Sequence, residues 1–235
     1  MPLLQTFISQ GSEGYLVHNV PLWFVMCLFV VEVLYYFLSY LKEELIVLLS
    51  IAFGVLGVLT IKATFFDFST LPWSIDVAFM ALPFYMAGNL LVKHFPHEMI
   101  VCSINRYWGR SVLVFVVSSF IVYCGANYNG IISMGHSYLG RSPSVFYITA
   151  FVGIIAFVIF SIAINNLSLK IVSGIKWIGR NSFRVMAIHN PIKGVLVLLL
   201  VKFTGGSTLD FINFIIAFAL TCIITIFVGL YSGTH

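Results

Sequence analysis

The chain has 235 residues, of which 60% are hydrophobic and only 9% are charged, whereas an ordinary soluble domain carries roughly 25% charged residues. So few charges cannot cover a globule in water, which excludes a soluble protein and favours a single membrane domain over residues 1–235. The net charge of +4 comes from Lys and Arg residues scattered singly between apolar runs, a pattern that sets membrane topology and argues against a nucleic-acid partner.

Seven apolar runs follow one another along the chain, each long enough, or nearly so, to cross a bilayer. A crossing needs about 20 apolar residues, and water-free lipid forces the backbone to form a helix. The runs are continuous rather than alternating, which disfavours a β-barrel. We therefore expect an all-α protein, a polytopic membrane helical bundle of about seven transmembrane helices, at residues 21–41, 45–61, 73–92, 111–126, 145–164, 183–201 and 211–230.

The segments between the runs are predicted to be turns and loops. Residues 94–110 form a longer polar connection, 127–143 are rich in Gly, Asn and Ser, and 165–180 are basic. Alternating the crossings places eight basic residues on one side and three on the other, and loops rich in Lys and Arg face the cytoplasm. The basic loops and the C-terminus are therefore expected to be cytoplasmic. The more basic side holds Lys42, Lys93, Arg106, Arg110, Lys170, Lys176, Arg180 and Arg184. The other side holds Lys62, Arg141 and Lys202.

Glu32 lies near the middle of the first run. A lone carboxylate at the bilayer centre costs about 2.5–3.5 kcal/mol on insertion scales, so Glu32 is expected to face the protein interior. Tyr35, Tyr36, Ser39 and Glu43 follow at helical spacing on the same face. This stripe either lines a polar cavity or holds a protonated Glu that bonds to a Tyr of a neighbouring helix.

The sixth run carries an unusual group of polar residues. Ser182 and His189 share one face, and His189 is followed by Asn190 and Pro191. Pro191 cannot donate a backbone hydrogen bond, and its ring displaces the carbonyl of Ala187. The run therefore either holds a polar ligand at a kink or contains a structural histidine.

No metal site is expected. His94 and His97 are three residues apart, but Pro96 lies between them and interrupts a regular helical pair. Asp76, near the start of the third run, is expected at the membrane interface. No P-loop, nucleophile-elbow or glycine-rich nucleotide motif occurs.

Four short motifs occur in the order found in one known family. Together they resemble the acyltransferase 3 family of membrane O-acyltransferases, in particular its fucose 4-O-acetylase-like branch, over residues 21 to 193. The motifs are PLWF at 21–24 opening the helix of Glu32, ALPFYMAG at 81–88, RSPSVFYITA at 141–150, and IGRNS at 178–182 with HNP at 189–191.

The resemblance implies transfer of an acetyl or similar acyl group, with acyl-CoA (acetyl-CoA) as the donor from the cytoplasm. The acceptor would be a hydroxyl of a cell-surface glycan or lipid-linked sugar, and the location the inner membrane of a bacterium. Such transfer needs a base, a donor site and an oxyanion stabiliser.

The candidate site residues follow from this chemistry. Trp23 is nominated as a cavity wall and Glu32 as a polar catalytic partner within the cavity. His189 is nominated as a supporting catalytic residue that orients substrate together with Asn190. The last two candidates are Lys176 and Arg180. Both lie on the predicted cytoplasmic side, where they would attract the phosphates of coenzyme A.

The family's first helices carry the Arg and the His thought to act in acyl transfer, and nothing before Pro21 matches them. We therefore expect the chain to be the C-terminal two-thirds of such an enzyme, with its N-terminal helices missing, and to be inactive alone. A separate chain supplying those helices is a possible partner. A membrane transporter or flippase, and a non-catalytic membrane partner, remain alternatives.

Overall fold

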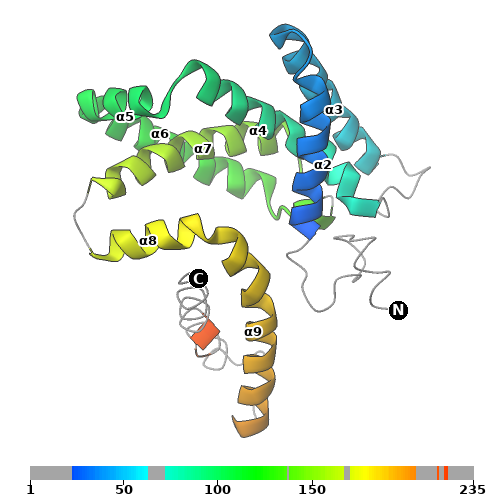
Figure 1. The fold of residues 1–235 in the computed structure, drawn as a ribbon, viewed down its shortest axis with the longest axis vertical. Helices are drawn as coiled ribbons and strands as arrows, with labels where there is room; N and C mark the ends of the chain where they lie inside the picture. The colour runs from blue at the N-terminus through cyan, green and yellow to red at the C-terminus, as the bar shows by residue number, and fades with distance from the viewer. Residues whose placement is uncertain are drawn as a thin grey trace. The chain divides into compact units, whose positions relative to one another are not determined.

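The computed structural model describes residues 23–62, 72–136, 138–166 and 170–204, together with residues 216 and 220–221. These residues form α-helices and two short 3-10 turns (Figure 1). The elements are α2 (Trp23–Leu38), α3 (Glu43–Lys62), η3 (Pro72–Ser74), α4 (Ile75–His94), α5 (His97–Arg106), α6 (Trp108–Asn129), η4 (Met134–His136), α7 (Pro143–Asn165), α8 (Lys170–Arg180) and α9 (Ser182–Thr204).

The all-α prediction is confirmed, and the first six apolar runs correspond to α2, α3, α4, α6, α7 and α9. Within the described residues, α3, α4, α6 and α7 are long and apolar enough to cross a membrane, whereas α2 is apolar but has 16 residues. The seventh run, 211–230, lies outside the described residues apart from three helical positions.

Two segments that were expected to be loops are helical. Residues 94–110 contain α5 and the start of α6, and residues 165–180 contain α8. Both new helices are amphipathic, so their apolar residues recur at helical spacing without forming a continuous run. A search for apolar runs therefore overlooks them.

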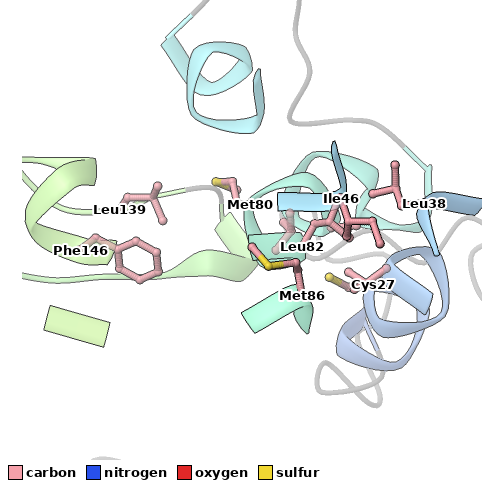
Figure 2. Close-up of a cluster of buried hydrophobic side chains, with 11 residues drawn as sticks. Cys27, Leu38, Ile46, Met80, Leu82, Met86, Leu139 and Phe146 are labelled. Atoms are coloured by element: carbon pink, nitrogen blue, oxygen red, sulfur yellow. The ribbon is translucent and has the colours of Figure 1, made fainter. Parts of the chain in front are cut away.

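The described helices belong to two compact units, one holding α2 to α7 and the other α8 and α9. In the first unit, α4 is the central helix, because α2 and α3 both pack on it. Its buried side chains form one apolar cluster with residues of α2, α3, α7 and the loop before α7 (Figure 2). The cluster consists of Cys27, Val31, Leu38, Ile46, Val77, Ala78, Met80, Leu82, Met86, Leu139 and Phe146.

Small residues allow α3 to approach α4 closely. A Cβ atom built on Gly54 would lie 2.7 Å from Cγ of Pro83, and one on Gly57 would lie 2.8 Å from Cγ of Met80. Ser50, one turn before Gly54, is fully buried. Small residues at this spacing are common where membrane helices meet, because they let backbones come together.

In the second unit, α8 and α9 meet at Asn181, where the ribbon bends (Figure 1). The backbone N–H and the side-chain amide of Asn181 both donate to the carbonyl of Trp177, at 3.0 Å each. The Gly-Arg-Asn-Ser sequence at 179–182 therefore forms the corner between an amphipathic helix and an apolar one.

Candidate functional site

The helices that carry three of the four sequence motifs pack together at α4. Tyr35 of α2 contacts Tyr85 of α4 edge to face, with ring centroids 5.1 Å apart. Phe84, on the neighbouring position of α4, stacks on Tyr147 of α7 at 5.3 Å and lies 4.8 Å from Phe151. The motifs at 21–24, 81–88 and 141–150 therefore belong to helices that pack on one another.

A proline inside α4 creates a polar contact at this junction. Pro83 has no N–H and leaves the carbonyl of Phe79 without its helical donor. One residue further on, the carbonyl of Met80 accepts a hydrogen bond of 2.9 Å from the hydroxyl of Tyr147. Side chains of neighbouring helices commonly satisfy carbonyls near a proline in a membrane. Sequence reasoning did not identify this bond, although Tyr147 lies in one of the motifs and Met80 directly precedes another.

Glu32 does not face the interior of the first unit. It lies on the exposed side of α2, whereas Cys27, Val31 and Leu38 form the buried side. The expected inward orientation is therefore wrong for the described structure, because the side of α2 that packs on α4 carries apolar residues. The catalytic role suggested for Glu32 stays a prediction.

The predicted polar stripe is also divided between two helices. Tyr36 and Tyr40 hydrogen-bond through their hydroxyls, and Ser39 bonds to the carbonyl of Tyr36 at 2.7 Å. Glu43 does not continue this face, because α2 ends at Leu38 and Glu43 begins α3.

Glu43 instead joins the ends of α3 and α4. One carboxylate oxygen lies 2.7 Å from Nζ of Lys93, and the other lies 2.6 Å from Nε2 of His94. His94 was expected in a loop, but it is the last residue of α4. All three side chains are partly exposed. The group therefore links the start of α3 to the end of α4, and exposed ion pairs of this kind contribute little to stability because water screens them.

Trp23 lies against a loop. Its indole atoms would be 2.9 Å from a Cβ built on Gly135, and the side chain is half-buried. Among the described cavities, none includes Trp23. Its proposed position in a cavity wall stays a prediction.

The loop that carries Gly135 is held by one buried amide. The Nδ2 group of Asn129 donates to the carbonyl of Leu139 at 2.8 Å, and its Oδ1 accepts from the backbone N–H of Ser142 at 2.7 Å. Gly140 adopts φ 79°, and a Cβ there would lie 2.5 Å from the carbonyl oxygen of Asn129. A glycine is required at this position both for the left-handed backbone and for the close approach.

Asp76 lies in the first turn of α4 and is 6% exposed. The positive end of the helix dipole favours a carboxylate there. The two residues before the helix, Trp73 and Ser74, have φ values of 61° and 52°. These left-handed conformations cost about 1–3 kcal/mol each, so the start of α4 is a strained turn.

The fourth motif and four of the candidate residues lie in the second unit. Lys176 and Arg180 are exposed on α8. His189 is half-buried on α9, and Asn190 follows it in the helix with its side chain outside the described part of the structure. The helix α9 continues through Pro191, and a kink there stays a prediction.

The backbone of α9 determines how His189 can act. Its Nδ1 lies 2.8 Å from the carbonyl oxygen of Met186 and 3.1 Å from that of Val185. A carbonyl only accepts hydrogen bonds, so Nδ1 must carry the proton in this arrangement. In the neutral imidazole, Nε2 is then the nitrogen with a lone pair, and it can accept a hydrogen bond or a proton from a hydroxyl.

Comparison with known families identifies the chain's family. The family model described as "Acyltransferase domain" (acyltransferase 3) matches residues 4–232. The match begins upstream of Pro21, so the expectation that nothing before that residue matches the family is wrong. Neither a curated protein nor a solved structure shows significant similarity. With almost its whole length matched and with helices suited to a bilayer, the chain belongs to the acyltransferase 3 family of membrane acyltransferases.

Proposed function

We propose that the chain takes part in O-acyl transfer, in which an acetyl or similar group passes from acyl-CoA to a hydroxyl of a cell-surface glycan. The observation that carries the proposal is the α8–α9 corner. It joins an amphipathic helix with exposed cations to a helix whose histidine has Nε2 available as an acceptor. The family match supports the acyltransferase part of the proposal.

In this proposal the cations of α8 bind the phosphates of coenzyme A. Lys176 and Arg180 lie four residues apart, which places them on the same side of the helix about one turn from each other. Arg binds phosphate oxygens in pairs through its planar guanidinium, and Lys adds a second positive charge. A phosphate group at the membrane surface would therefore find two donors on one helix.

His189 would orient the acceptor hydroxyl. It lies seven residues into α9, about 10 Å along the helix axis from Ser182 at a rise of about 1.5 Å per residue. The hydroxyl oxygen attacks the thioester carbonyl and forms the ester C–O bond. The C–S bond then breaks, and the hydroxyl proton passes through a base to the departing thiolate. His189 would accept the hydroxyl hydrogen bond through Nε2, and Asn190 would assist in holding the acceptor.

Binding of coenzyme A to the purified chain tests the donor site without requiring turnover. Lys176→Gln with Arg180→Gln should weaken binding of acetyl-CoA about tenfold, which corresponds to ~1.4 kcal/mol. Lys202→Gln is the matched control, because Lys202 is also exposed but lies near the other end of α9. Equal binding by the double variant and the parent chain would refute the donor site.

Turnover tests the acceptor role. Radiolabelled acetyl-CoA is supplied to membranes with a mixture of glycan acceptors, using the chain alone and the chain fused to three preceding helices of a family member. We expect acyl transfer only by the fusion, and we expect His189→Ala to lower its kcat/KM by about 10²–10⁴-fold, the usual range for a group that handles the proton. Transfer by the chain alone would contradict the need for further helices. Unchanged turnover by His189→Ala would contradict the role of His189.

The proposed orientation places the basic loops and the C-terminus in the cytoplasm of a bacterium. Single cysteines at Arg106, Lys176 and Tyr138 in a cysteine-free chain report the side of each loop. We expect the first two to react only from the cytoplasm and the third only from outside. Labelling of position 138 from the cytoplasm alone would contradict this topology.

A further inference from the structure

Two arginines converge on one tyrosine at the corner between α5 and α6. The guanidinium carbon of Arg106 lies 5.6 Å from the ring centroid of Tyr107, and that of Arg110 lies 5.4 Å from the same centroid. Both arginines are exposed. Within the described part of the chain, neither arginine forms an ion pair with a carboxylate, so no described carboxylate neutralises this arginine pair.

Hydrogen bonds fix the corner that carries the arginines. The hydroxyl of Ser111 donates to the carbonyl of Ile104 at 3.1 Å and lies 3.2 Å from that of Tyr107. The side chain of Asn166, just beyond α7, donates to that of Asn105 at 2.8 Å. The end of α5 is therefore held both to the start of α6 and to the end of α7.

An apolar cavity of about 480 Å³ lies beside the same corner. It is formed by the end of α4, by α5 and by α7, and its lining includes Leu91, Ile100, Ile104 and Ile155. Ser103 is the one polar residue that lines it. Ile104 thus lies in the cavity while its carbonyl is bonded to Ser111, the neighbour of Arg110. The volume falls within the 300–1,000 Å³ typical of ligand sites.

An apolar cavity beside two guanidinium groups that have no carboxylate partner among the described residues fits an amphiphile with a phosphate head and an acyl tail. Two of the α7 side chains at the cavity, Ile154 and Ile155, are 47% and 49% exposed on a helix suited to a bilayer. The cavity is therefore open to hydrocarbon, where phospholipid is the abundant amphiphile. Basic pockets between membrane helices bind anionic headgroups.

We propose that this corner binds an anionic phospholipid. Its phosphate lies on Arg106 and Arg110, and one acyl chain occupies the cavity between α5 and α7. This inference is independent of the proposed acyl transfer, because it uses none of the residues assigned to donor or acceptor. It would make the α5–α6 corner a lipid anchor at the membrane surface.

Native mass spectrometry of the whole chain tests the proposal. The protein is extracted from vesicles of equimolar phosphatidylglycerol and phosphatidylcholine, and retained lipid is counted. We expect phosphatidylglycerol to be favoured about 25-fold, because each arginine near a membrane surface favours an anionic lipid about fivefold. Arg106→Gln with Arg110→Gln should abolish the preference, and the corresponding Lys variant should keep most of it.

Matched controls distinguish binding from general damage. Arg141 also stacks on a tyrosine, with its guanidinium carbon 5.3 Å from the ring of Tyr128, so Arg141→Gln should leave the preference unchanged. Ile155→Trp should fill the cavity and reduce retention of both lipids, whereas Ile148→Trp should not, because Ile148 is exposed on α7 outside the cavity.

Three outcomes would overturn the lipid site. One is equal retention of the two phospholipids by the parent chain. Another is an unchanged preference after both arginines are replaced, with circular dichroism confirming the fold. The third is retention of palmitoyl-CoA in place of phosphatidylglycerol, which would assign the same corner to an acyl donor.

Discussion

Replacement of Gly54 by Ala tests whether the contact between α3 and α4 depends on a missing side chain. The new Cβ atom would lie 2.7 Å from Cγ of Pro83 and 3.4 Å from the hydroxyl of Tyr147. A proline ring cannot rotate away, so the two helices must separate or distort. Overpacking of this kind costs about 1–3 kcal/mol. Ala also gains about 0.8–1.0 kcal/mol over Gly in a helix interior, which offsets part of that cost.

Gly88→Ala supplies the matched control, because among the described residues no atom beyond the neighbouring residues and local backbone of α4 lies within 4 Å of a Cβ built there. It receives the same helical gain without the clash. We therefore expect the free energies of unfolding of the two variants to differ by about 1–3 kcal/mol, with Gly54→Ala the less stable. Equilibrium unfolding in mixed detergent and dodecyl sulfate micelles measures the difference.

A double variant identifies the origin of the effect. If the ring of Pro83 causes the clash, adding Pro83→Ala should recover stability, and the two changes should not be additive. Equal stability of Gly54→Ala and Gly88→Ala would refute the close packing of α3 on α4. A strictly additive double variant would show that the cost arises somewhere other than the proline ring.

Three further substitutions test individual contacts. Tyr147→Phe keeps the ring stack but loses the hydrogen bond to α4, and it should lower the free energy of unfolding by about 0.6–1.7 kcal/mol relative to the exposed control Tyr123→Phe; equal values would contradict the bond. Glu32→Leu should make membrane insertion of α2 more favourable by about 3 kcal/mol in a glycosylation-mapping assay, because the carboxylate is exposed; loss of folded protein would instead reveal a buried partner. Asn129→Ala should destabilise the chain by about 1–3 kcal/mol, since it leaves buried backbone groups without partners, and proteolysis should cut the loop at 130–142 faster than in Asn127→Ala. Identical cleavage rates would argue against the Asn129 hydrogen bonds.

Hydropathy predicted the positions of the membrane helices well but underestimated the lengths of two of them. The runs at 45–61 and 111–126 were the shortest, yet α3 has 20 residues and α6 has 22. Helices continue through polar residues at the ends of an apolar run, where backbone and side chains reach the interface. The amphipathic helices α5 and α8 were missed for a related reason, because their apolar residues are spread along one face.

The candidate site was predictable only in part. The polar residues of α9 and the cations of α8 stood out because charged and polar side chains are rare in this chain. The bond between Tyr147 and the Met80 carbonyl could not be recognised in the sequence, since 67 residues separate the two positions. The close contact of Gly54 and Gly57 with α4 had a detectable signal, which is the spacing of small residues along α3.

The sequence by itself determined the class of protein and most of its helices, because hydropathy acts locally and twenty apolar residues in lipid have to form a helix whatever surrounds them. Only the tertiary structure decided which side of each helix is buried. From the sequence, Glu32 was expected to face the interior, on the assumption that the polar side of α2 meets protein. In the structure the apolar side of α2 packs on α4, and Glu32 is exposed. The orientation of a helix depends on the shape of its neighbours, and that information lies in residues distant along the chain.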